Sequence, residues 1–201
     1  MQAHRNKGLH YIHVAQLGFS ILGMAALGYW AWVTVSSHLY QARESARFDR
    51  EIHQANFAKP QLPPKPAVED GGLLGRLEIP RLGLSVMVVE GVNSGELKRA
   101  VGHIPGTALP GDGSNVGIAG HRDTFFRPLR LIHSNDLIDL NTTVGTYRYR
   151  VVSTKVVSPA DVQLLYPNGK DTLTLVTCFP FYYVGSAPQR FIVRAERIQG
   201  S

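Results

Sequence analysis

Cys178 is the only cysteine in the chain, and its type gives it chemistry that few other side chains have. A thiolate is a reactive nucleophile, and a nearby imidazole such as that of His121 can pair with it or deliver a proton to a leaving amine. The guanidinium of Arg190 could stabilise the negative charge that forms on a carbonyl oxygen under attack. Together these three residue types would carry out acyl transfer through a thioester, although each alone also fits an ordinary structural role.

The positions of these residues in predicted strands indicate that they share one face. Alternate side chains of a strand point to opposite sides of its sheet. In the predicted strand Thr172–Cys178 the two leucines face the core, which turns Cys178 outward. The same alternation turns His121 outward at the end of a strand that begins at Asn115, and it turns Arg190 outward at the start of the last strand. An antiparallel hairpin would bring Cys178 and Arg190 to the same end of the sheet, whereas the sequence leaves open whether His121 reaches them.

The elements that must position these residues are short alternating apolar runs, which begin at Leu73 and are separated by Gly, Pro and Asn. Many short strands with few helices predict a mainly β fold, a closed or nearly closed antiparallel barrel of about 130 residues. The predicted strands are Leu74–Ile79, Leu84–Val89, Asn115–Gly120, Leu137–Leu140, Thr146–Val157, Thr172–Cys178 and Arg190–Ile198. The predicted short helices are Ser94–Val101, Phe125–Ile132 and Asp161–Tyr166.

A long apolar run precedes the barrel and contains no Asp, Glu, Lys or Arg from Tyr11 to Leu39. About 20 apolar residues in a helix cross the hydrocarbon core of a bilayer, so this run predicts one transmembrane anchor over residues 11–39. A cleavable signal peptide is the alternative. The run is longer than the usual apolar region of a signal peptide, and no clear small-x-small cleavage site follows it.

The predicted organisation has four parts: a short cytoplasmic N-terminus over 1–10, the anchor over 11–39, a polar and Pro-rich stalk over 40–72, and a catalytic domain over 73–201. The stalk begins with a polar helical extension and continues into a Pro-rich stretch from Lys59 to Gly72. Basic residues lie on both sides of the anchor, so charge counting does not fix the orientation. The function inferred below favours a cytoplasmic N-terminus.

Composition excludes several classes of protein. The formal charge is +6, but residues 73–201 hold 14 basic against 10 acidic residues without a basic cluster, which argues against a nucleic-acid partner. A single cysteine excludes an intramolecular disulfide and a multi-cysteine metal site. His103 and His121 lack a third metal ligand at a recognisable spacing, and no dense acidic cluster suggests calcium, so no metal and no cofactor is predicted.

Several motifs resemble those of the sortases, a family of cysteine transpeptidases. Residues 174–178, Thr-Leu-Val-Thr-Cys, resemble the Thr-Leu-x-Thr-Cys signature of that family. His121, within Gly-His-Arg at 120–122, resembles the catalytic histidine, and Arg190 resembles the essential arginine. The resemblance runs from about Leu74 to Ala195, and residues 116–126 are most similar to class D sortases.

This resemblance implies an eight-stranded sortase barrel in which Cys178 is the nucleophile, His121 the general acid and Arg190 the support for substrate or oxyanion. It also implies exported protein substrates that carry a Leu-Pro-x-Thr-Gly-like C-terminal sorting signal, an amine acceptor, and a single-pass position in a bacterial cell membrane. Contact with membrane lipid would be made by the N-terminal helix.

Lesser candidates surround these three residues. Thr177, Tyr182 and Ala119 are predicted to contribute to substrate binding, because they lie beside the nucleophile, in the loop after it, and beside the histidine. Asp123 could orient His121 or could cap the short helix that follows. Two other functions remain open: a membrane-tethered cysteine hydrolase that passes the acyl group to water, and a non-enzymatic exported binding barrel.

Overall fold

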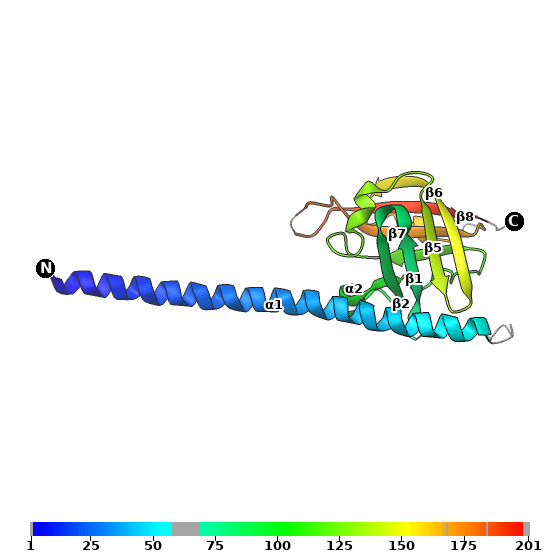
Figure 1. Ribbon diagram of the computed structural model, residues 1–201. Coiled ribbons are helices and arrows are strands. Elements are labelled where there is room, and N and C mark those ends of the chain that lie inside the picture. The colour runs from blue at the N-terminus through cyan, green and yellow to red at the C-terminus, as the bar shows by residue number, and fades with distance from the viewer. Residues whose placement is uncertain (1, 58–68, 168, 184, 199–201) are drawn as a thin grey trace. The chain divides into compact units, whose positions relative to one another are not determined.

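The computed structural model describes residues 2–57, 69–167, 169–183 and 185–198 of the chain. The chain divides into two units, residues 1–39 and residues 40–201. Helix α1 (Gln2–Phe57) supplies the whole described part of the first unit and continues into the second, where the strands lie (Figure 1).

The first part of α1 is apolar on all sides. Its large apolar side chains between Leu17 and Trp32 are all more than half exposed. Within the described residues, the stretch Gln16–Arg50 is the one helical segment long and apolar enough to cross a membrane, with a mean hydropathy of 1.4. A helix that is apolar all round without protein cover matches an apolar solvent better than water. The predicted apolar N-terminal helix is therefore confirmed as a candidate membrane span.

Within the described residues, eight strands form a closed barrel in the order β1-β2-β3-β4-β7-β8-β6-β5. The strands are β1 (Leu73–Ile79), β2 (Leu84–Glu90), β3 (Val101–His103), β4 (Asn115–Ala119), β5 (Leu137–Thr142), β6 (Gly145–Val157), β7 (Thr172–Phe179) and β8 (Gln189–Arg197). Short helices lie in the connections: η1 (Pro80–Leu82), α2 (Ser94–Arg99), η2 (Arg127–Leu131) and η3 (Val162–Leu165).

All seven strands predicted from the alternating pattern are present, with ends within two residues of those expected. The eighth, β3, was not visible in the pattern because it has only three residues, all buried, with Gly102 at its centre. A side chain there would place Cβ 2.0 Å from the carbonyl oxygen of Gly91, so the close approach of two backbones requires glycine. The helix predicted to reach Val101 ends at Arg99 because Val101 pairs with β2.

The prediction of an antiparallel barrel was wrong for two of the strand pairs. Strand β3 pairs with β2 in parallel, and β7 pairs with β4 in parallel. A parallel pair needs a crossover connection, which α2 provides between β2 and β3. Strands β4 and β7 are separated by two other strands in the sequence, so no local turn signal could reveal their pairing.

The core is formed by the inward faces of the strands. The predicted alternation is confirmed for Val116, Ile118, Leu173, Leu175 and Val193, which are all fully buried. The connection between β4 and β5 adds three apolar side chains to the same core, those of Phe126, Leu129 and Ile132. Burial of this kind contributes roughly 1.5–3 kcal/mol per large apolar side chain, so the barrel needs no disulfide.

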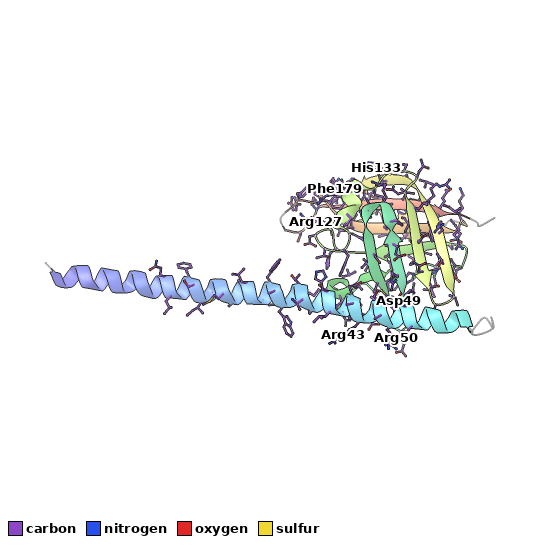
Figure 2. All side chains as sticks on the ribbon, viewed as in Figure 1. Arg43, Asp49, Arg50, Arg127, His133 and Phe179 are labelled. Carbon is purple, nitrogen blue, oxygen red and sulfur yellow. The ribbon has the colours of Figure 1, made fainter. Side chains whose placement is uncertain are left out.

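The second part of α1, from Tyr40 onward, packs on the outer face of β1 and β2. Phe48 is fully buried there, with the Arg76 guanidinium 5.3 Å from its ring centroid. Arg76 also donates a hydrogen bond to Asp49 at 2.7 Å, and the backbone N–H of Met87 donates to the side chain of Gln41 at 2.8 Å. Figure 2 shows Asp49 on the side of the helix that faces the strands. Residues 59–68 of the predicted Pro-rich stretch, which was expected from Lys59 to Gly72, lie outside the described residues.

Candidate active site

Cys178 and Arg190 face each other across the hairpin of β7 and β8. In this antiparallel ladder Cys178 pairs directly with Arg190. Directly opposed residues point to the same face of a sheet, with Cβ atoms about 4.5–5.5 Å apart. Both residues are half-buried, and Arg190 donates through Nη1 to the carbonyl oxygens of Ala187 at 3.2 Å and Gln189 at 3.0 Å. These bonds hold the arginine at the end of the loop that joins the two strands.

His121 follows the end of β4, the neighbour of β7 on its other side. The parallel register pairs Ala119 with Val176, and the Gly120 N–H donates to the carbonyl oxygen of Val176 at 3.1 Å. Continuing this register by two residues would bring His121 beside Cys178. The backbone at 120 must be glycine because a Cβ there would lie 2.7 Å from the ring of Phe126, inside the core.

Three neighbouring strands thus present their side chains in rows on the outer face. One row holds Ala119, Val176 and Ile192, which are paired across β4, β7 and β8. The next row, about 7 Å further along the strands, holds Cys178 and Arg190, and the continued register of β4 points His121 toward it. The apolar row of Ala119, Val176 and Ile192, called the apolar floor below, therefore lies directly beside the row that contains the thiol.

The connection between β6 and β7, which contains η3, borders this apolar row. The carbonyl oxygen of Leu164 accepts hydrogen bonds from Asn115 Nδ2 at 3.1 Å and from Arg194 Nη2 at 3.0 Å. These bonds hold η3 over the outer face. A cavity of about 60 Å³ remains beneath it, lined by Ser153, Lys155, Leu164, Ile192 and Arg194. Sequence reasoning missed Asn115 and Leu164 because a buried amide and a loop carbonyl carry no motif.

The loop after β3 lies over Gly117 of β4. Thr107 Oγ1 accepts a hydrogen bond from the Gly117 N–H at 3.0 Å. His103 fixes this loop from beneath, because its Nδ1 lies 2.8 Å from Glu90 Oε2 and its Nε2 donates to the Ala108 carbonyl at 3.0 Å. His103 is 2% exposed, so both of its ring nitrogens are engaged by protein groups away from solvent.

The lesser candidates lie in different environments. Ala119 is half-buried on the outer face, in the row described above. Thr177 points to the opposite face from Cys178, is 2% exposed, and donates to the Gly120 carbonyl oxygen at 2.7 Å. It therefore ties β7 to the backbone beside His121, and does not line the floor.

The two remaining candidates, Tyr182 and Asp123, lie on exposed loops. Tyr182 is 74% exposed in the loop after β7, with the guanidinium of Arg130 5.7 Å from its ring centroid. Asp123 is exposed and makes no hydrogen bond or ion pair with any residue that the structure describes. The short helix η2 has no side-chain cap. No contact therefore supports either predicted role of Asp123, orienting His121 or capping the helix.

Comparison with known proteins gives the family to which this geometry belongs. The sortase domain model matches residues 77–198, which is more than half of the chain. The chain belongs to the sortase family. Sortases are a family of cysteine transpeptidases, and residues 77–198 are the part of this chain that matches their domain.

Individual relatives of this sortase agree with the family match. It is 35% identical to Sortase D of Bacillus subtilis over 131 residues, 65% of this chain and 66% of that protein. Among solved structures, it resembles Sortase A from Corynebacterium diphtheriae with a TM-score of 0.60 and 31% identity, over 64% of this chain and 62% of that one. These matches confirm the predicted resemblance to sortases, class D included. The chain spans slightly less than two thirds of the length of these two relatives.

A second solved structure is that of sortase C from Clostridium perfringens with the C-terminal cell wall sorting motif. This sortase resembles it with a TM-score of 0.61 and 27% identity, over 78% of this chain and 90% of that one. The fold of the present chain is therefore shared with a sortase that was solved with the C-terminal cell wall sorting motif.

Proposed function

We propose that this sortase cleaves a Leu-Pro-x-Thr-Gly-like sorting signal after the threonine and transfers the acyl fragment to an amine on the cell surface. The observation that carries the proposal is the direct pairing of Cys178 with Arg190 on β7 and β8, beside the strand end that bears His121. The apolar row formed by Ala119, Val176 and Ile192 would receive the apolar part of the signal. The sortase C solved with a sorting motif supports the same class of substrate.

In the proposed first step, Cys178 Sγ attacks the carbonyl carbon between threonine and glycine. Negative charge develops on the carbonyl oxygen, where the Arg190 guanidinium can donate hydrogen bonds. As the C–N bond breaks, His121 gives a proton to the leaving glycine amine, and a thioester remains on Cys178. In the second step the acceptor amine attacks the thioester, loses a proton to His121, and releases the thiolate. One amide bond replaces another, so the reaction needs no cofactor.

The proposed location is a bacterial cell membrane, crossed once by the first part of α1, with the barrel outside the cytoplasm. The exposed apolar side chains between Leu17 and Trp32 support membrane contact, since exposing such a surface to water is unfavourable. The proposed organisation remains a cytoplasmic N-terminus over 1–10, an anchor over 11–39, a stalk over 40–72 and a catalytic domain over 73–201. The two alternatives are a hydrolase that uses water as acceptor and a binding barrel without activity.

The test uses the full chain in detergent, a library of Leu-Pro-x-Thr-Gly-type peptides, and mass analysis of the products with and without an added amine. We expect cleavage after threonine, an amide product when the amine is present, and a hydroxamate when hydroxylamine intercepts the thioester. Cys178→Ala should lose all of these products while keeping the unfolding temperature of the wild type. Hydrolysis that ignores the amine would favour the hydrolase, and an active alanine variant would remove Cys178 from the mechanism.

A further inference from the structure

The loop between β7 and β8, residues 180–188, joins the cysteine to the arginine, and an aromatic cluster fixes its base. Phe181 packs against Phe191 with ring centroids 5.3 Å apart and against Phe179 at 6.0 Å, both in edge-on geometry. Phe179 and Phe191 stack at 6.3 Å. Such aromatic pairs hold a segment by both area and geometry. The start of the loop is therefore packed against the ends of β7 and β8.

The outer part of the same loop is held by Arg122, the residue after His121. Arg122 Nη2 donates hydrogen bonds to the carbonyl oxygens of Tyr183 at 2.7 Å and Gly185 at 3.1 Å. Its guanidinium also lies 5.9 Å from the ring centroid of Tyr183. Its other terminal nitrogen, Nη1, is closed off from solvent and has no hydrogen-bond partner among the described residues. A buried donor of this kind is costly to leave unpaired, and the two hydrogen bonds of Nη2 are what hold the guanidinium against the loop.

These contacts connect three segments that the proposed reaction needs in one arrangement. Arg122 is adjacent to His121 in the chain, and the loop that it holds runs from Cys178 to Arg190. Figure 2 shows Arg127, from the same connection between β4 and β5 as Arg122, at the same end of the barrel as Phe179, the last residue of β7. The histidine segment and the β7–β8 loop are thus fastened to each other directly, not only through the strands.

The loop lies beyond the strand ends, on the side away from the apolar row. If the acyl fragment occupies that row, the leaving group and then the incoming amine must lie on the loop side of Cys178. We propose that Arg122 is a positioning residue that orders the β7–β8 loop for the acceptor amine. This inference rests on the proposed transpeptidase function. It makes Arg122 important for the second step of that reaction, the attack of the acceptor amine on the thioester.

The first test does not depend on activity. Chymotrypsin cleaves after exposed tyrosine, and Tyr182 and Tyr183 are 74% and 47% exposed in the loop. In the full chain in detergent, Arg122→Ala should be cut at these two sites roughly tenfold faster than the wild type, because loss of charge-assisted hydrogen bonds favours the open loop. Arg127→Ala is the matched control, since Arg127 is exposed in the same segment and its side chain makes no hydrogen bond or ion pair with a described residue. A wild-type cutting rate in Arg122→Ala would overturn the proposal.

The second test separates the two chemical steps. In Arg122→Ala, release of the leaving fragment should stay within about threefold of the wild type, while the KM for the amine should rise roughly tenfold and hydrolysis should increase at the expense of transfer. Arg122→Lys should recover only part of the loss, because a lysine keeps the charge but not the planar fork. Equal losses in both steps, or an unchanged KM for the amine, would contradict the positioning role. Absence of thioester in the wild type would instead contradict the proposed function, with the cutting result still standing for the loop.

Discussion

At the scale of single residues, Arg190 lies opposite Cys178 and could act on the substrate in two ways, through its positive charge and through the direction of its N–H groups. Arg190 Nη1 donates hydrogen bonds to the carbonyl oxygens of Ala187 and Gln189, and these bonds fix the side chain before substrate binds. A prefixed donor needs little reorganisation when charge develops on the substrate oxygen. The direction of its N–H groups should therefore matter as much as its charge.

Replacement of Arg190 tests this at the same scale. If directed donation dominates, Arg190→Lys should lose about as much kcat as Arg190→Ala, on the order of 100-fold or more, by comparison with removal of one oxyanion donor. Steady-state kinetics on the full chain would measure it, with unfolding temperatures close to the wild type as the control. Rescue of most of the rate by lysine would show that charge suffices. Near-wild-type turnover in Arg190→Ala would remove Arg190 from the active site.

At the scale of elements, the second part of α1 behaves as part of the barrel. The Phe48 ring is fully buried beside Arg76, and Gln41 accepts a hydrogen bond from the backbone of β2 at Met87. These contacts cover an outer face of β1 and β2 that would otherwise present Met87, 1% exposed, to solvent. The segment from Tyr40 onward therefore stabilises the unit that contains the barrel, even though it precedes the first strand.

Removal of the Phe48 ring should consequently destabilise the whole unit. Phe48→Ala is expected to lower the free energy of unfolding by roughly 3–5 kcal/mol, the usual cost of deleting a fully buried aromatic side chain. Denaturant unfolding of the full chain in detergent measures this free energy. The unfolding should be monitored by a signal that comes from the strands and does not depend on tryptophan. Arg43→Ala, an exposed position on the same helix, is the control and should change stability little (Figure 2). Equal stability of the two variants would mean that the helix does not pack on β1 and β2 in solution.

At the scale of the whole molecule, the exposed apolar surface of the first part of α1 is the feature that barrel packing does not explain. With large apolar side chains exposed on every side between Leu17 and Trp32, this part of the helix is a candidate membrane anchor. A substrate delivered by export would then meet an enzyme already held at the membrane.

The topology follows as a prediction. Protease added to intact spheroplasts should remove the barrel and leave a membrane-bound N-terminal fragment, because the proposed substrates are exported chains. Immunoblotting against tags at the two termini would follow both products, and a cytoplasmic marker protein should stay intact. Full protection of the barrel would place it in the cytoplasm. Recovery of a soluble chain that lacks residues 1–39 before any protease is added would show a cleaved signal sequence.

The sequence alone determined what depends on neighbours along the chain. Period-two alternation predicted seven strands and the inward leucines of β7, because side-chain direction in a strand is set locally. A motif around Cys178 indicated the family, and an uncharged apolar run indicated the N-terminal helix. Each of these features can be read from a window of a few to about 30 residues.

Only the tertiary structure decided which distant segments meet. The parallel pairing of β4 with β7, which brings the His121 strand end beside Cys178, joins segments with two strands between them in the sequence. The hydrogen bond from Asn115 to the Leu164 carbonyl in η3 and the hydrogen bonds from Arg122 to the β7–β8 loop likewise join segments that are distant in the sequence. Such contacts depend on backbone carbonyls and on packing across the barrel. Every residue has a backbone carbonyl, so these contacts leave no recognisable pattern in the sequence. A linear pattern therefore identified the reactive groups, and the closure of the barrel set the positions from which they can act.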